Sequence, residues 1–522
     1  MDKKLILILI LAFFLRLYGI SWDSGFHFHP DERLITMVAN QLHFFDKLDP
    51  NFFNYGSLPF YLLKGSAQLI DLFFSAHTAT YQGLLYIGRT LSILFDVGTT
   101  FIIYKLVMIF SKKKKVAFFS SFIYAVMFFP IQNSHFFTVD ILFTFLTTLL
   151  LYELVLYSRN RSLMYLFTIS ISFAALFATK FTAVIFLPII LLTVAIKNEF
   201  SYFSILHSLF FILITLSFSF LFMPYAFLDY PSFVRDISLQ LTMSKNPYVF
   251  PYTLQYVNTT PYLYFLKNII MWGMGPFISL LCLIGLRYKL KFKNVISNDY
   301  LMFVIFYSFY FLVIGASAVK FMRYMLPLYP FFAVLAGFGL SRIHNRTVML
   351  TYITVTIIWS LFFITIYSYD NTRIAATEWI LNTVKPGSRL AVEYWDDYLP
   401  VYKIEDYYLN ELHLYDLPDN DSKWKHLNDQ LQKSDYLIIA SNRLSVPLQR
   451  LADCNTYRLC YPKTAEYYQK LFAGGLNFKK AAEFSVKPGF QIGSFKFQIN
   501  DESADESFTV FDHPKITIFK KL

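Results

Sequence analysis

Two neighbouring carboxylates, Asp31 and Glu32, follow an N-terminal apolar run in the stretch His29-Pro30-Asp31-Glu32. A carboxylate within hydrogen-bond reach of a hydroxyl group can take its proton as a general base. Acids in the first turn of a helix also stabilise that end through the helix dipole, so capping is the alternative interpretation. Adjacent helical residues point about 100° apart. We therefore expect one acid of the pair to act and the other to bind or orient.

Three basic residues, Arg89, Lys180 and Arg323, stand at the ends of apolar runs that we place at the same membrane level as this acidic loop. A lone cation at such a place reaches to the membrane interface and needs no ligand. Several cations beside an acidic loop instead predict a phosphate-binding pocket. Asp140, which follows His135 closely, is expected there as a second carboxylate, and both residues are candidates for an acceptor site.

These residue types together suit the transfer of a group away from a phosphate. The attacking hydroxyl group must lose a proton, and a carboxylate can accept it. The departing phosphate gains negative charge, and fixed cations stabilise that charge. The elements that carry these residues must therefore bring an acid and several cations to one place.

The composition indicates that most of these elements cross a membrane. Hydrophobic residues make up 56% of the 522 residues, and charged residues only 16%, well below the quarter that is usual in soluble domains. Apolar runs of about 20 residues, enough to span a bilayer, recur through residue 368. The net charge of +11 could suggest nucleic-acid binding. The basic residues instead fill short gaps between runs, at 112–115, 159–161 and 342–346, as in cytoplasmic loops, so we expect no nucleic-acid partner.

The runs predict a polytopic α-helical domain over residues 1–369, with about eleven membrane helices. We expect the protein in the plasma membrane, with its N-terminus in the cytoplasm. Residues 5–20 are expected to form a first membrane helix that is retained. Residues 21–82 and 225–262 are then outer loops. Leu34 to Leu42 follow Pro30 with helical apolar spacing, which predicts an amphipathic helix on the membrane surface.

Residues 370–522 differ in composition from the rest of the chain, because polar residues increase and no spanning run remains. Alternating patterns predict strands at 390–392 and 436–440 and a helix at 424–431. We expect a small extracytoplasmic α/β domain. Cys454 and Cys460 lie in it and could form a disulfide outside the cytoplasm, but the sequence leaves their pairing open.

No cofactor is assigned from the sequence. His27 and His29 are weak candidates for metal ligands, but they have no recognisable ligand spacing, so a divalent metal is left open.

Four stretches resemble the GT-C superfamily of membrane glycosyltransferases, and most of all its protein O-mannosyltransferase and aminoarabinose transferase branch, the family 39-like enzymes. They are HPDE at 29–32, Asp140 at the head of the fourth span, ATKFTA at 178–183 and RYMLPLYP at 323–330. The resemblance implies an inverting transfer of a sugar from a polyprenyl-phosphate donor to an extracytoplasmic acceptor with a hydroxyl group, on a protein, lipid or glycan. It implies that Asp31 is the base, that Glu32 supports it or the acceptor, and that Lys180 and Arg323 hold the phosphate. Arg89 is a third candidate for the phosphate from its position alone.

Two other functional classes remain as alternatives. A transporter or flippase of lipid-linked sugars would keep ionisable groups near the bilayer midplane, and Asp96, inside the second apolar run, favours it. A purely structural anchor for the tail domain would leave the outer acids and cations unexplained.

Overall fold

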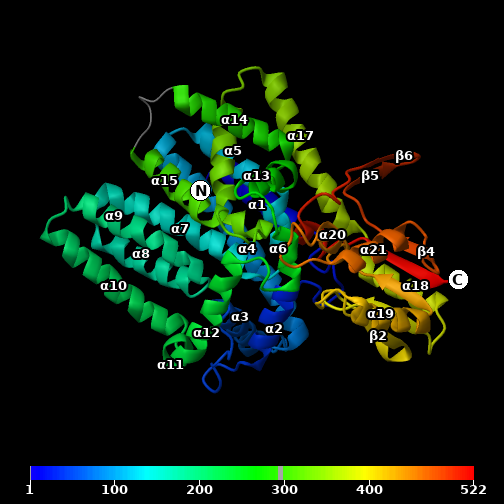
Figure 1. The fold of residues 1–522 in the computed structure, drawn as a ribbon. Helices are drawn as coiled ribbons and strands as arrows, with labels where there is room; N and C mark the ends of the chain where they lie inside the picture. The colour runs from blue at the N-terminus through cyan, green and yellow to red at the C-terminus, as the bar shows by residue number, and fades with distance from the viewer. Residues whose placement is uncertain (1, 292–297) are drawn as a thin grey trace. The chain divides into compact units, whose positions relative to one another are not determined.

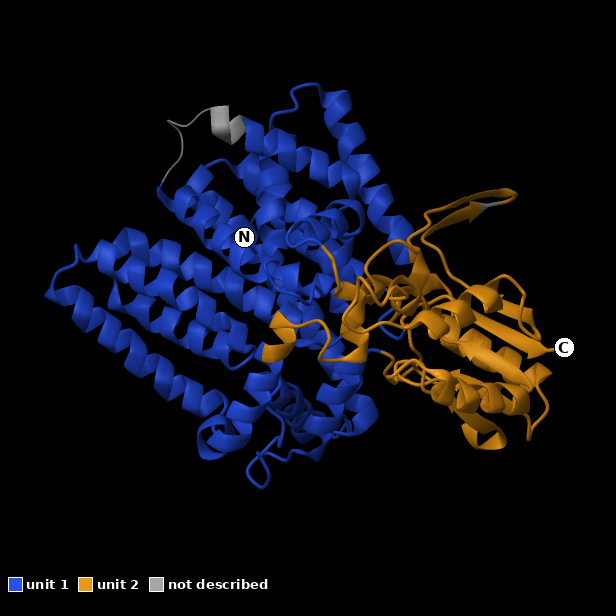
Figure 2. Ribbon diagram, in the orientation of Figure 1, with its two compact units in different colours: residues 1–21, 29–241, 260–364 blue, residues 22–28, 242–259, 365–522 orange. Residues whose placement is uncertain are grey.

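The computed structural model describes residues 2–291 and 298–522, which form helices and a smaller set of strands (Figure 1). The chain divides into two compact units (Figure 2), residues 1–21, 29–241 and 260–364 in unit 1, and residues 22–28, 242–259 and 365–522 in unit 2. The division after Ile364 precedes the expected boundary at 369/370. Two segments of the expected outer loops also belong to unit 2, which local composition could not reveal.

Unit 1 consists of helices, most of them apolar. Its longer helices are α1 (Lys3–Leu17), α4 (Tyr81–Ser111), α5 (Lys114–Val126), α7 (Val139–Asn160), α8 (Leu163–Phe177), α9 (Leu187–Lys197), α10 (Tyr202–Phe222), α12 (Tyr230–Lys245), α14 (Gly275–Lys291), α15 (Asn298–Gly315), α16 (Tyr329–Ser341) and α17 (Arg346–Ile364). Most of these helices coincide with predicted apolar runs, whereas α12 lies in 225–262, which was expected to be an outer loop.

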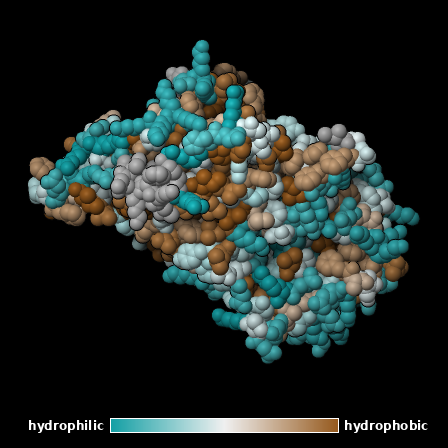
Figure 3. Space-filling model, turned by 90° about the horizontal axis from the view of Figure 1, so that it is seen from above, coloured by the Kyte–Doolittle hydropathy of each residue, from teal (hydrophilic) through white to brown (hydrophobic). Residues whose placement is uncertain are grey.

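Within the described residues, six helices are long and apolar enough to cross a membrane, or up to eight if each bent pair is one span. The expected count of eleven is not confirmed, because several predicted runs form helices shorter than a full span, such as α8 and α9. Large apolar side chains of α10 are exposed, for example Leu213 at 64%, and apolar atoms are exposed among polar ones in Figure 3. The chain is a multi-pass membrane protein.

The acidic stretch opens helix α2 (Pro30–Gln41), with the proline in the first turn, where its missing N–H costs nothing. The apolar face of α2 was expected on the membrane surface, and this expectation was wrong. Ile35 and Ala39 are fully buried and pack in one cluster with Phe60 and Leu63 of α3 (Leu58–Phe74). An amphipathic pattern requires an apolar covering, and here protein provides it.

Helices α14 and α16 approach each other at two glycines. A Cβ atom at Gly285 would lie 2.0 Å from the Leu335 carbonyl oxygen, and one at Gly339 would lie 2.1 Å from the Leu281 carbonyl oxygen. Such a close approach of two backbones requires glycine. The 3₁₀ segment η5 (Met322–Leu328), which carries Arg323, leads directly into α16, so this packing helps to fix it.

A buried ion pair joins α1 to α4. Arg16 and Asp96 are both fully buried, and the Arg16 Nε atom lies 2.5 Å from an Asp96 carboxylate oxygen. Asp96 also accepts hydrogen bonds from the Tyr124 and Ser134 hydroxyl groups. Removing one partner of such a pair is strongly destabilising, by about 3–5 kcal/mol. Asp96 therefore has a structural partner inside unit 1.

Unit 2 contains a five-stranded sheet with the order β2-β1-β3-β7-β4, which confirms the α/β prediction. Strands β2 and β3 are parallel to β1, whereas β7 is antiparallel to both of its neighbours, β3 and β4. The strands are β1 (Arg389–Glu393), β2 (Tyr408–Leu412), β3 (Tyr436–Ile439), β4 (Phe478–Phe484) and β7 (Ile516–Lys521), and the helices include α18 (Thr372–Thr383), α19 (Asp421–Lys433) and α21 (Pro462–Phe472).

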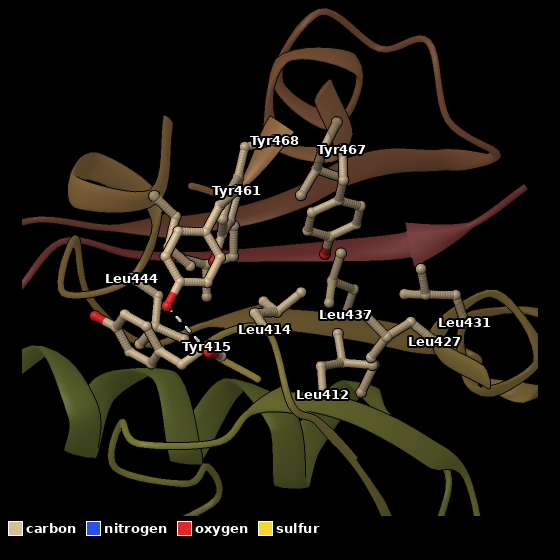
Figure 4. Close-up of a cluster of buried hydrophobic side chains, with 14 of the residues drawn as sticks. Leu412, Leu414, Tyr415, Leu427, Leu431, Leu437, Leu444, Tyr461, Tyr467 and Tyr468 are labelled. Carbon is tan, nitrogen blue, oxygen red and sulfur yellow. Dashed lines mark hydrogen bonds between the residues drawn. The ribbon is translucent and has the colours of Figure 1, made fainter. Parts of the chain in front are cut away.

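Alternate residues of the central strands supply two cores, as the period of a strand requires. Leu437 joins the core in Figure 4, whereas Ile438 joins the other core with Ile380 of α18. Leu254 and Val257, from segment 242–259, are each only 2% exposed and complete the first core.

Further contacts bind the two inserted segments to the rest of unit 2. The Gln255 side-chain amide donates to Glu506 at 2.5 Å, and Arg450 donates to the Gln255 carbonyl oxygen at 2.7 Å. In segment 22–28, Phe28 lies under the guanidinium of Arg373 at 5.3 Å. Cys454 and Cys460 form a disulfide.

Candidate active site

Four charged side chains from four separate elements of unit 1 form one cluster. Asp31 is in the first turn of α2 and Asp140 in the first turn of α7. Lys180 directly precedes the 3₁₀ segment η1 (Phe181–Phe186), and Arg323 lies in η5. The sequence predicted all four as site residues, although they are up to 292 positions apart (323 minus 31).

The cations of the cluster are shared between its two carboxylates. Arg323 Nη2 lies 2.9 Å from Asp31 Oδ2, and Arg323 Nε lies 3.5 Å from Asp140 Oδ2. Lys180 Nζ donates to the other Asp140 oxygen, Oδ1, at 2.8 Å. Asp140 is 4% exposed, whereas Asp31, Lys180 and Arg323 are 19%, 18% and 13% exposed. The cluster is thus well ordered and still reached by solvent.

Aromatic side chains border the two cations. Lys180 Nζ lies 4.5 Å from the centre of the Tyr324 ring, and the Arg323 guanidinium lies 4.4 Å from that of Phe321. Burial, and after it the negative charge of Asp31, raise the pKa of Tyr55 well above its usual range. The Tyr55 hydroxyl group therefore stays protonated. Sequence reasoning placed Tyr55 at the opening of a second interfacial segment of the outer loop and gave it no role in the site, because no charge marks it.

The loop that carries Tyr55 is held against the chain that carries Lys180. Gly56 N donates to the Thr179 carbonyl oxygen at 3.2 Å, and Leu58 N donates to the Ala178 carbonyl oxygen at 3.0 Å. A Cβ atom at position 56 would lie 1.9 Å from the Ala178 oxygen, so only glycine fits.

Glu32 and Arg89 form a separate, fully buried pair. Arg89 donates to both oxygens of Glu32, from Nε at 3.0 Å and from Nη2 at 2.7 Å. The backbone N–H of Phe137 donates to Glu32 at 2.7 Å, and Arg89 also donates to the Ile20 carbonyl oxygen at 2.7 Å. The structure does not bring either residue to the four-residue cluster. A bidentate pair of this kind fixes α2 against α4, close to Asp31.

The predicted histidines take different places. His135 is fully buried, with its ring nitrogens 2.8 Å from the Ile131 oxygen and 2.7 Å from the Tyr18 oxygen. The His29 ring contacts the Phe136 ring in a tilted arrangement in unit 1, whereas His27 belongs to unit 2. Among residues 2–291 and 298–522, no three His, Cys, Asp or Glu side chains form a group that could hold a metal ion.

Residues 78–227 match the family model described as dolichyl-phosphate-mannose-protein mannosyltransferase. The chain is similar to the protein O-mannosyltransferases of the GT-C superfamily. The matched part holds Asp140, Lys180 and Arg89, whereas Asp31 precedes it and Arg323 follows it. No curated protein matches the chain.

Solved structures extend the likeness of fold beyond the matched part. The archaeal oligosaccharyltransferase AglB from Archaeoglobus fulgidus, in complex with an inhibitory peptide and a dolichol-phosphate, is 13% identical, with a TM-score of 0.52. The alignment covers 92% of this chain and 73% of AglB. Apo ArnT from Cupriavidus metallidurans is 12% identical over 98% of this chain and 97% of its own, with a TM-score of 0.48. The likeness to AglB, which covers most of this chain, shows that the two share a fold. Unit 2 forms the small C-terminal sheet domain.

Proposed function

We propose that the chain transfers a sugar from a polyprenyl-phosphate donor to a hydroxyl group of an acceptor outside the cytoplasm. The cluster of Asp31, Asp140, Lys180 and Arg323 carries this proposal, because it combines a solvent-reached carboxylate with two fixed cations. The family match over residues 78–227 and the dolichol-phosphate bound to AglB support a lipid-phosphate donor.

In the proposed reaction, the acceptor oxygen attacks the anomeric carbon of the sugar and forms the new glycosidic bond. The bond between that carbon and the phosphate oxygen breaks, and its electron pair leaves with the lipid phosphate. The acceptor proton passes to Asp31 as the general base. Lys180 and Arg323 stabilise the charge that develops on the phosphate. A single displacement of this kind inverts the anomeric centre.

The sharing of Arg323 suggests how Asp31 becomes available. The Asp31 carboxylate contacts Arg323 at 2.9 Å, so it must leave this contact before it can face the acceptor hydroxyl group. A donor phosphate would compete with Asp31 for the same guanidinium, and the carboxylate would turn towards the acceptor. Asp140 contacts both cations and would keep them in place meanwhile.

Glu32 and Arg89 receive a positioning role in this proposal. Both side chains are fully buried and paired with each other. We therefore assign Arg89 to the support of Glu32 rather than to the phosphate. Glu32 in turn fixes the first turn of α2, from which Asp31 projects.

The basic residues in the short gaps between apolar runs support an extracytoplasmic site. Helix α7 carries Asp140 in its first turn and Arg159 in its last, and a 22-residue helix is about 33 Å long. The cluster and Arg159 therefore lie at opposite membrane faces. The positive-inside rule places the arginine in the cytoplasm and the cluster outside. The disulfide of unit 2 fits an oxidising compartment.

The transporter alternative has lost its supporting residue. Asp96 is fully buried, and its charge is balanced by Arg16. It therefore does not offer an unpaired charge to a transported substrate.

Radiolabel transfer tests the proposed function. Membranes that contain the chain would be incubated with a panel of radiolabelled polyprenyl-phosphate sugars, with membranes lacking the chain as the control. We expect one donor to label a protein, lipid or glycan only when the chain is present. Movement of the labelled lipid across the bilayer without any transfer would contradict the proposal and favour a flippase.

A further inference from the structure

A small hairpin of unit 2 stands apart from the five-stranded sheet. Among the strands of the described residues, β5 (Gly489–Ile492) and β6 (Phe495–Gln498) pair only with each other. Figure 2 shows the hairpin extending away from the larger sheet. An isolated two-stranded hairpin is at best marginally stable in water. A second surface that covers one of its faces would stabilise it.

The register gives the hairpin one aromatic face. Phe490 is opposite Phe497, and Gln491 is opposite Lys496. Because side chains alternate along a strand, Phe495 and Phe497 lie on the face of Phe490, and Gln491 and Lys496 lie on the other face. Phe495 is 61% exposed and Phe497 is 43% exposed. Two large aromatic side chains are therefore presented together on one face.

The base of the hairpin is tied to the residue that follows a membrane helix. The Thr365 hydroxyl group donates to the Gly489 carbonyl oxygen at 2.8 Å and accepts from the Gly489 N–H at 3.3 Å. Thr365 directly follows α17 (Arg346–Ile364), which opens the helical stretch Arg346–Thr383, a stretch long and apolar enough to cross a bilayer. The covalent chain and these two hydrogen bonds thus link the start of the hairpin to the last residue of α17.

We propose that the aromatic face of the β5–β6 hairpin lies in the headgroup region of the bilayer where α17 leaves it, and anchors unit 2 to lipid. Aromatic side chains favour this interface, and the polar face with Lys496 suits contact with anionic headgroups and water. The open edges of a two-stranded sheet keep the hairpin out of the hydrocarbon core, where unpaired backbone groups are costly. This inference holds whichever sugar or acceptor the chain uses.

Nitroxide labels on the full chain test the contact with lipid. Cys282 is buried and Cys454 is paired with Cys460, so a new surface cysteine can be labelled selectively. The labelled variant is Phe495→Cys, in nanodiscs that each hold one copy. Matched controls are Lys496→Cys, on the polar face, and Glu466→Cys, on α21 with a 58% exposed side chain.

We expect the label at 495 to be accessible to oxygen, which concentrates in lipid, and protected from a water-soluble nickel chelate. The labels at 466 and 496 should be accessible to the chelate. Equal chelate accessibility at 495 and 466 would overturn the proposal. Protection from both reagents would also overturn it, because protein would then cover the face. Chelate protection seen only in discs with two copies would overturn it in favour of a contact between chains. Because Phe495 is mostly exposed, its replacement should not disturb folding. A nitroxide label on Phe497→Cys provides an independent second measurement of accessibility on the same face.

Discussion

Arg323 contacts two carboxylates at once, and the difference between these contacts separates their roles. Its contact with Asp31 is at 2.9 Å and its contact with Asp140 at 3.5 Å, while Asp140 is also bonded to Lys180. Asp140 is nearly buried, and Asp31 is more exposed. In the proposed mechanism, Asp31 is therefore the carboxylate that exchanges its partner and accepts a proton, and Asp140 is the one that holds the cations.

The first prediction concerns proton transfer. Asp31→Asn keeps the shape of the side chain and removes its basicity, so turnover should fall by about 10²–10⁴-fold, the usual contribution of a general base. Donor binding should be retained, because an amide no longer competes for Arg323 with a negative charge. Both quantities would be measured on the same purified variant, with Asp46→Asn, at an exposed aspartate of the same loop, as the control. Near-normal turnover would instead leave Asp31 with the capping role.

The second prediction concerns the phosphate. Arg323→Ala and Lys180→Ala should each weaken donor binding, because a charge-assisted hydrogen bond contributes about 1.5–3 kcal/mol, or roughly 10- to 150-fold in affinity. Titration of the purified variants with the donor would measure this loss. Arg235→Ala, at a 73% exposed side chain, is the matched control. Unchanged affinity in both variants would reduce the two residues to interfacial anchors.

The third prediction is a pH dependence in unit 2. Burial raises the pKa of Glu393 from about 4.5 to about 8, even though it accepts a hydrogen bond from Tyr468. Between these two values the folded state binds more protons than the unfolded state, so stability should fall as pH rises from 4.5 to 8. Glu393→Gln removes the titration and keeps an acceptor for Tyr468.

Thermal unfolding of the purified chain at pH 5 and pH 8 measures this effect. The stability advantage of Glu393→Gln over the wild type should be larger at pH 8. At that pH the wild-type carboxyl group ionises either in the folded protein, where burial opposes its charge, or when the protein unfolds. Glu466→Gln, at an exposed glutamate, is the control. An equal advantage at both pH values would show that Glu393 does not titrate in this window.

At the scale of elements, the site depends on a close backbone approach between two loops. Gly56→Ala places a methyl group 1.9 Å from the Ala178 oxygen, so the loop with Tyr55 must move away from the chain with Lys180. We predict a loss of donor affinity with little change in the amount of folded protein. Gly65→Ala is the control, because its methyl group meets only the Phe44 ring, at 3.1 Å. Wild-type affinity in Gly56→Ala would mean that this contact does not position Lys180.

The elements themselves could largely be predicted from the sequence. The apolar runs at 84–110, 139–157 and 203–223 predicted α4, α7 and α10 to within three residues, because a spanning helix needs a long apolar stretch. The sequence could not predict whether lipid or protein covers the apolar face of α2, since either of them can bury apolar side chains. The pairing of Glu32 with Arg89 was equally hidden, because 57 residues separate them and no local pattern marks a buried partner.

Membership of the cluster was easier to predict than its internal order. We predicted its four members, Asp31, Asp140, Lys180 and Arg323, from their charge at the ends of apolar runs. Charged residues at such places are rare and are commonly functional. Which cation contacts which carboxylate depends on packing between distant helices. Tyr55 and Tyr324 were missed for a related reason, because tyrosine is common throughout this chain and carries no distinctive charge.

At the scale of the whole molecule, unit 2 is not a contiguous tail. Residues 365–522 expressed alone lack Leu254 and Val257, whose burial would contribute about 1.5–3 kcal/mol each. We predict that a fragment with residues 242–259 linked to 365–522 unfolds at a higher temperature than 365–522 alone. The control carries Leu254→Ala and Val257→Ala in the linked segment. Identical unfolding temperatures for all three would show that the tail folds independently.

The inserted segments also set an order of events during synthesis. Residues 22–28 and 242–259 leave the ribosome before the sheet that they complete, which begins at residue 389. In the proposed topology, both segments are translocated and remain without the rest of unit 2 while the four apolar helices α14 to α17 are still to be inserted. The first core of unit 2 can form completely only after translation has reached β7. This strand begins at Ile516, six residues before the last residue of the chain. A nascent chain stopped at residue 369 would therefore expose both segments, and they are where we expect chaperones and proteases of the outer compartment to act first.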